Sequence, residues 1–217
     1  MAATVETPKE AEKRKRRERE ALLLLFLFLL QDTRHTLTRS VTLYLAGTLA
    51  FGDLSDALAA TLTDAHAHAA YLGRRLAGAR GPFGAADRQF GATVAFEQAG
   101  YLQGLLHGLE GGRYAAGEDG ELPGDLANRI RLYVLRCRGT ANEAWSLALP
   151  PDTLINWVLG PNTNHCPSCP QFAAGSPYRA DSLPTTPGSA DCICLSACLC
   201  HLETLGGATA FPVPVGI

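Results

Sequence analysis

Six of the seven cysteines stand within residues 164–203, and this crowding limits what the chain can fold into more than any other feature. A Cys-x-x-Cys pair comes first, and after a 24-residue insert the chain offers Cys-x-x-x-Cys-x-Cys. A Cys-x-x-Cys turn presents two thiolates from one side, which is the geometry that tetrahedral zinc sites use. The spacing predicts a structural zinc ion held by four of five cysteines: Cys166, Cys169, Cys194, Cys198 and Cys200.

The insert between the two cysteine groups has few large apolar side chains and is rich in proline, glycine and serine. A structural zinc ion can supply the free energy that burial does not, on the order of 10 kcal/mol in small peptides. Cys166 and Cys169 are the strongest ligand candidates, and the choice between Cys194 and Cys200 is open. Disulfides and a small core of reduced thiols are the alternatives. Because the cysteines crowd at one end, unlike the frameworks of secreted domains, a reducing cytosol is favoured.

Before residue 160 the apolar residues repeat at intervals of three and four, which is typical of helices with one buried face. The repeats predict helices over 22–49, 54–76, 90–109 and 126–149, with Asp53 as the N-cap of the second. There is almost no strand signal. The predicted fold class is mainly α: an antiparallel helical bundle over residues 21–160, with a small cysteine-rich, zinc-binding module (161–203) hung on its end.

The two ends of the chain differ in character. Residues 1–20 have seven Lys and Arg against five Glu, and we expect them to be disordered or to form the solvated start of a helix. Residues 204–217 are predicted to form an extended apolar tail, either on a neighbouring subunit or frayed. A basic run in the first segment could contact DNA or an acidic partner: Lys13, Arg14, Lys15, Arg16 and Arg17. The net charge of −2 argues against a general affinity for nucleic acid.

Residues 21–30 are ten consecutive apolar residues behind this basic run, an order that resembles a signal peptide. Acidic residues interrupt the charge, however, and no small-residue cleavage site follows. Ten residues are also well short of the roughly 20 that cross a bilayer. We therefore expect no membrane association, and we expect a helix that is buried on several sides.

Few residues outside the cysteine stretch suggest chemistry. His66 and His68 are two apart on a predicted helix, so they point to different faces and are expected on its solvated surface. Cys137 is in phase with the apolar face and is expected to be buried. The chain has no phosphate loop or nucleophile elbow, so we expect neither an enzyme nor a small-molecule substrate. The aromatic residues expected to contact a partner lie around the cysteines: Trp157, Phe172 and Tyr178.

The segments 166–169, 173–178, 183–188 and 194–203 together resemble the C-terminal signature of tailed-phage minor head proteins, the head-morphogenesis proteins related to the F protein of phage Mu. The likeness extends more loosely back to about residue 21. It departs from the family at 197–200, where Ala-Cys-Leu-Cys stands in place of Asn-Cys-Arg-Cys, and at the extra thiol of Cys192.

The resemblance implies a structural minor capsid protein that acts in head morphogenesis near the portal or the inner capsid. Its implied partners are the portal protein, the major capsid protein or both. It would be located in the virion, and in the bacterial host cytoplasm during assembly. The alternative is a zinc-knuckle module that binds DNA through the basic N-terminus, which a salt-dependent gel shift would reveal.

Overall fold

The computed structural model describes residues 6–114, 122–161 and 165–212. It is mainly helical. The helices are α1 (Pro8–Leu45), α2 (Phe51–Leu76), α3 (Ala85–Glu97), α4 (Ala99–Glu110), α5 (Gly124–Leu147) and α6 (Ser168–Ala174). The strands are β1 (Leu154–Val158), β2 (Tyr178–Arg179) and β3 (His201–Thr204), and two short 3-10 helices are η1 (Ala180–Ser182) and η2 (Leu195–Ala197).

Helix α1 begins much earlier than the apolar repeat predicted. The Thr7 hydroxyl accepts a hydrogen bond from the Glu10 amide, and the Glu10 carboxylate accepts one from the Thr7 amide, with Pro8 in the first turn. This reciprocal pair satisfies amide donors that a helix start otherwise leaves free. Of the two expectations for residues 1–20, disorder or the solvated start of a helix, the structure has the helix from Pro8 onward, and the basic run lies on its solvated turns.

Further along, α1 buries one face of the predicted apolar block. Leu22, Phe26 and Leu30 are buried at intervals of four residues, whereas Leu24 and Phe28 are each 67% exposed. The block is thus buried on one side only, which corrects the expectation of burial on several sides. Within the described residues, no helix is long and apolar enough to cross a membrane.

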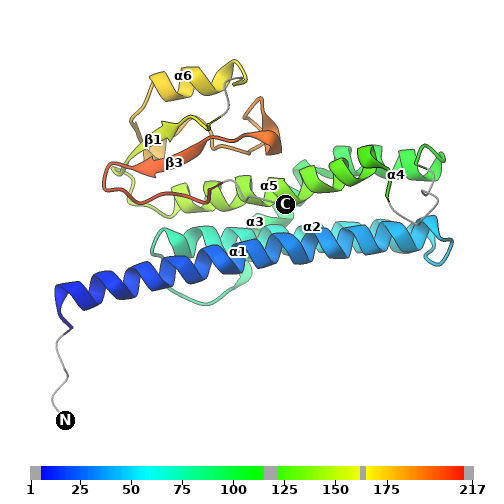
Figure 1. The fold of residues 1–217 in the computed structure, drawn as a ribbon, viewed down its shortest axis with the longest axis horizontal. Coiled ribbons are helices and arrows are strands. Elements are labelled where there is room, and N and C mark those ends of the chain that lie inside the picture. The colour runs from blue at the N-terminus through cyan, green and yellow to red at the C-terminus, as the bar shows by residue number, and fades with distance from the viewer. Residues whose placement is uncertain (1–5, 115–121, 162–164, 213–217) are drawn as a thin grey trace, which may run out of the picture.

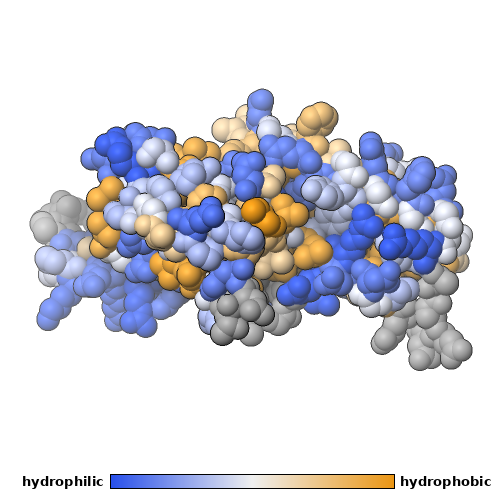
Figure 2. All heavy atoms as spheres, turned by 90° about the horizontal axis from the view of Figure 1, so that it is seen from above, coloured by the Kyte–Doolittle hydropathy of each residue, from blue (hydrophilic) through white to orange (hydrophobic). Residues whose placement is uncertain are grey.

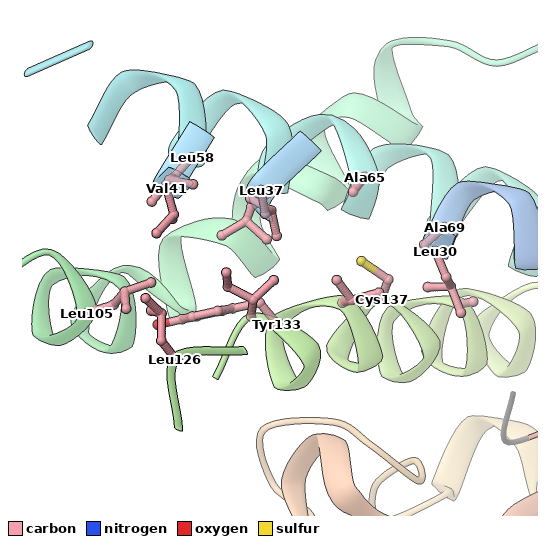
Figure 3. Close-up of a cluster of buried hydrophobic side chains, with 14 of the residues drawn as sticks. Leu30, Leu37, Val41, Leu58, Ala65, Ala69, Leu105, Leu126, Tyr133 and Cys137 are labelled. Carbon is pink, nitrogen blue, oxygen red and sulfur yellow. The ribbon is translucent and has the colours of Figure 1, made fainter. Parts of the chain in front are cut away.

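The core of the helical body lies between α1, α2 and α5 (Figure 3). Leu30, Leu37 and Val41 meet Leu58 of α2 and Tyr133 of α5 in one cluster of buried side chains. Close approach of α2 to α5 depends on a glycine. A methyl group at Gly73 would lie only 2.2 Å from the carbonyl oxygen of Ala141, so a larger residue would push the two helices apart.

Two helix boundaries differ from the prediction. Ala50 is the N-cap of α2, and Asp53 lies in the first turn of that helix. There its negative charge interacts favourably with the positive end of the helix dipole. The third predicted helix is divided at Gln98 into α3 and α4. Gln98 is buried, and its side-chain amide donates a hydrogen bond to His66 of α2, so its conformation follows from a contact with another helix.

The C-terminal module, which in the structure includes β1 and extends to residue 212, rests along α5 rather than at the end of the helical body (Figure 1). Its antiparallel sheet has the order β2-β1-β3, with Trp157 opposite Leu202. Strand β1 precedes residue 160 and corrects the expectation that strands are absent there. A five-residue strand gives little periodic signal, and its partners come from distant sequence.

Polar and small residues on α5 hold the module in place. Asn142 is fully buried, and its amide donates to the carbonyl of Pro187 at 3.1 Å. A methyl group at Gly139 would lie 2.1 Å from the carbonyl oxygen of Gly188, which itself has a φ of +87°. The 183–190 loop therefore packs backbone against backbone on α5, at positions that only glycine permits.

The start of the predicted free tail folds back onto the body. Phe211 is fully buried, with its ring centroid 4.2 Å from that of Phe26, and its amide donates to Oδ1 of Asn142 at 3.1 Å. The prediction of an extended tail, either on a neighbouring subunit or frayed, is wrong for residues 204–212. Residues 213–217 lie outside the described residues.

Apolar side chains also reach the surface. On the face that carries the module, apolar patches alternate with hydrophilic ones (Figure 2). The most exposed large apolar residues of the module are Ile193, at 64%, and Leu205, at 61%. The aromatic residues proposed as partner anchors are not among them: Trp157 is 3% exposed, and Phe172 packs on it with ring centroids 4.8 Å apart. That expectation is wrong for Trp157.

Candidate metal centre

Two segments of irregular chain bring the sulfur atoms of the module together. Cys166 precedes α6 and Cys169 lies in its first turn, so the helix start turns both thiols to the same side. The second segment, 189–200, winds through consecutive turns, with the Leu195 amide donating to the Cys192 carbonyl at 2.7 Å. Leu195 has a φ of +48°, a conformation uncommon outside glycine, so the turn is constrained where the thiols converge.

Six sulfur atoms gather in one cluster that could hold a metal ion. Cys169 Sγ lies 3.4 Å from that of Cys166, 3.5 Å from that of Cys194 and 3.7 Å from that of Cys198. Zinc–sulfur bonds of about 2.3 Å in a tetrahedron place sulfur atoms about 3.8 Å apart. The thiols therefore stand near the spacing that tetrahedral coordination needs.

All five cysteines proposed as ligands lie in this cluster, and a sixth joins them. Cys192 is fully buried and groups with Cys166, Cys169 and Cys194, all four sulfur atoms lying within 4.8 Å of one another. Sequence reasoning set Cys192 apart as an extra thiol, although its position two residues before Cys194 was a usable signal. The seventh, Cys137, is buried in the core of the body, where burial raises its pKa to about 12.

The pKa values of the thiols in the cluster are shifted in opposite directions. Hydrogen bonds with Cys198 lower the pKa of Cys192 and that of Cys200 to about 5 each. Burial raises the pKa of Cys169, and hydrogen bonds with Cys192 and Cys200 raise that of Cys198. Ionised sulfur is thus favoured at Cys192 and Cys200 over Cys169 and Cys198. A metal ion needs thiolate ligands, so binding displaces the remaining protons.

Arg138 of α5 places a buried cation against the cluster. It is 2% exposed, and its guanidinium donates to the carbonyl of Cys198 at 2.7 Å and to those of Cys200 and Phe211. No carboxylate of the described residues pairs with it. Burial lowers its pKa to about 10, and the thiols of Cys192, Cys198 and Cys200 oppose that effect. A buried cation needs a compensating anion, which a metal–thiolate cluster supplies. This role of Arg138 could not be predicted from the sequence.

His66 is fully buried, contrary to the expectation of a solvated surface. Its Nε2 accepts from the Gln98 amide at 2.7 Å, so Nδ1 carries the proton and faces the Thr140 hydroxyl at 2.8 Å. Burial, reinforced by the nearby charge of Arg136, lowers its pKa to about 3. His66 is therefore a neutral structural link between α2, α5 and the α3–α4 junction. His68 is half-exposed and stacks on Phe83, with centroids 4.4 Å apart.

Comparison of the chain with family models, curated proteins and solved structures finds no match. The likeness to phage minor head proteins thus rests on the motif residues alone.

Proposed function

We propose that this chain is a structural minor head protein of a tailed bacteriophage, in which an antiparallel helical bundle carries a zinc-stabilised docking module. It acts by binding rather than by chemistry. The observation that carries the structural role is the burial of the sulfur cluster, in which Cys169, Cys192, Cys198 and Cys200 are each at most 2% exposed. A structural zinc site is closed by its ligands, whereas a catalytic site keeps one position open to water or substrate.

The place in the virion is the one that the resemblance implies, near the portal or the inner capsid, with the portal protein, the major capsid protein or both as partners. Its support is the string of motifs over 166–203, which includes both cysteine groups. The metal ion that we expect is zinc. Four sulfur ligands at tetrahedral spacing are typical of zinc sites and of iron–sulfur sites.

The test uses a Cys166→Ser, Cys169→Ser double variant in an assembly assay with the portal and major capsid proteins of the phage that encodes this chain. We expect the variant to keep its helical circular dichroism and to be missing from purified heads. Cys137→Ala is the matched control, because it removes a buried thiol outside the cluster. Normal incorporation of the double variant, or absence of the wild-type protein from heads, would refute the proposal.

DNA binding through the basic N-terminus is the second candidate. It is favoured by the exposure of all five basic residues between Lys13 and Arg17 and by the projection of this end of α1 beyond the module (Figure 1). Ion pairs of Arg14 with Glu6 at 3.0 Å and of Arg16 with Glu20 at 2.8 Å reduce the free positive charge. A duplex DNA gel shift that weakens steeply with salt, and that is lost on deletion of residues 1–17, would support it.

A further inference from the structure

The number of sulfur atoms in the cluster exceeds what one metal ion can use. A tetrahedral ion takes four ligands, and one group of four is complete: Cys166, Cys169, Cys192 and Cys194. Cys169, Cys198 and Cys200 form a second group, also within 4.8 Å of one another. A single ion in the first group would leave Cys198 and Cys200 as buried thiols, 2% and 1% exposed, directly beside it.

Cys169 belongs to both groups and lies between them. Its Sγ stands 3.4 Å from Cys166 and 3.5 Å from Cys194 on one side, and 3.7 Å from Cys198 on the other. Each distance is close to the edge of a zinc–sulfur tetrahedron, about 3.8 Å. One sulfur atom at the corner of two tetrahedra is in the position of a bridging thiolate.

Cys192 adjoins the second group without being part of it. It belongs to the first group, and hydrogen bonding with Cys198 is the largest cause of the lowered pKa of its thiol. The sulfur atoms of the second group that lie within 4.8 Å of one another are those of Cys169, Cys198 and Cys200, so an ion held there lacks a fourth ligand. Cys192 supplies that ligand if it closes on the second group as metal binds, which leaves Cys166 and Cys194 as the outer pair on one side, and Cys198 and Cys200 as the outer pair on the other.

The buried cation of Arg138 beside the second group also favours a second metal ion there. The Arg138 guanidinium donates to the backbone carbonyls of Cys198 and Cys200, so it lies on the side of this group. Metal-bound sulfur atoms are thiolates, so a metal ion held by this group would set negative charge beside the buried cation. Adjacent thiolates repel one another, however, and a second divalent cation among them removes that repulsion.

We propose that the cysteine cluster binds two zinc ions in a binuclear centre, with Cys169 and Cys192 as the two bridging thiolates. Cys166 and Cys194 complete the tetrahedron of the first ion, and Cys198 and Cys200 complete that of the second. Six thiolates and two divalent cations leave a net charge of −6 + 4 = −2, beside the cation of Arg138. This inference rests on the structural metal role proposed above and adds to it the second ion and the bridges.

The test is the metal content of the full chain, purified under reducing conditions, loaded with zinc, freed of excess metal and measured by native mass spectrometry. We expect two zinc ions per chain. A Cys198→Ser, Cys200→Ser variant removes both outer ligands of the second ion and should bind one. Cys137→Ala, which leaves the cluster untouched, should bind two.

Substitution with ¹¹³Cd tests the bridges themselves, because two cadmium ions joined by a thiolate split each other's nuclear magnetic resonance signals. Two mutually coupled resonances are expected for the wild-type chain. One zinc ion per chain, or two uncoupled resonances, would overturn the binuclear centre while the structural role of a metal stands. No bound zinc would overturn both, and iron with acid-labile sulfide would overturn the zinc centre. The zinc content and the cadmium resonances of the wild-type chain test the binuclear centre even if the Cys198→Ser, Cys200→Ser variant does not fold.

Discussion

The helical body and the C-terminal module are held together in different ways. The body buries a continuous cluster of Leu, Val, Ile and aromatic side chains from α1, α2 and α5. The buried cluster of the module contains four cysteines, Cys169, Cys192, Cys198 and Cys200, among a few apolar residues such as Trp145, Ile155 and Leu202. In the body the stabilising free energy is spread over many apolar contacts, whereas in the module we propose that much of it comes from a metal ion bound by the sulfur atoms.

Removal of the metal should produce the largest effect and should separate the two regions. With a strong chelator under reducing conditions, we expect β1 and β3 to lose amide hydrogen-exchange protection, while α1, α2 and α5 keep theirs. The lost binding free energy is on the order of 10 kcal/mol in small zinc peptides. Hydrogen exchange read by mass spectrometry measures this. Unchanged protection of β1 and β3 after metal loss would mean that the module does not depend on the ion.

Leu37→Ala tests the body by comparison. Leu37 is 2% exposed in the core, and truncation should lower the free energy of unfolding by about 2–5 kcal/mol. Leu24→Ala, at a position 67% exposed on the same helix, should change it by no more than about 0.5 kcal/mol. Urea unfolding followed by circular dichroism gives both values. Similar losses in the two variants would contradict the assignment of the buried face.

Acid should act on the body through His66. The unfolded chain binds a proton at this residue below a pH of about 6.5, but burial holds the folded pKa at about 3. The unfolded state therefore binds more protons between these values, so stability falls as the pH is lowered from about 6.5 to 3, by at most about 1.4 kcal/mol per pH unit. His66→Gln should flatten this part of the stability curve, and His68→Gln should leave it unchanged. Equal slopes for wild type and His66→Gln would refute the assignment.

The smallest effect is expected from deletion of residues 1–17. These turns of α1 are almost entirely exposed, and their ion pairs contribute little because water screens them. Glu18, which pairs with Arg75 of α2 at 2.9 Å, is retained. Differential scanning calorimetry should give the same unfolding midpoint as the full chain. A clear drop would place the basic segment within the folded body.

The sequence predicted the body better than the module because helix patterns are local. The intervals between Leu22, Phe26, Leu30, Leu37 and Val41 are set by one helix and can be read without knowledge of its neighbours. The cysteine spacing likewise indicated a cluster that could hold a metal ion. Its assignment to zinc and the choice of ligands remain predictions.

What the sequence missed depends on contacts between distant segments. His66 looked solvated because its partners, Gln98 and Thr140, belong to other helices. The break at Gln98 has the same origin. Trp157 looked exposed because β1 is recognisable only once β2 and β3 are paired with it. In the sequence Arg138 is one of several charged residues on a predicted helix. Its role is visible only in the folded structure, where it donates a hydrogen bond to the carbonyl of Cys198.

The packing of Phe211 against Phe26 has a consequence for the order in which the chain can fold during synthesis. The ribosome synthesises residue 26 long before residue 211, whose ring covers it in the folded chain. We expect nascent chains stalled before residue 204 to expose Phe26 and to bind hydrophobic-patch chaperones, and release to follow once residue 212 has left the exit tunnel. Crosslinking of stalled chains of increasing length to the host's nascent-chain chaperone would locate that point.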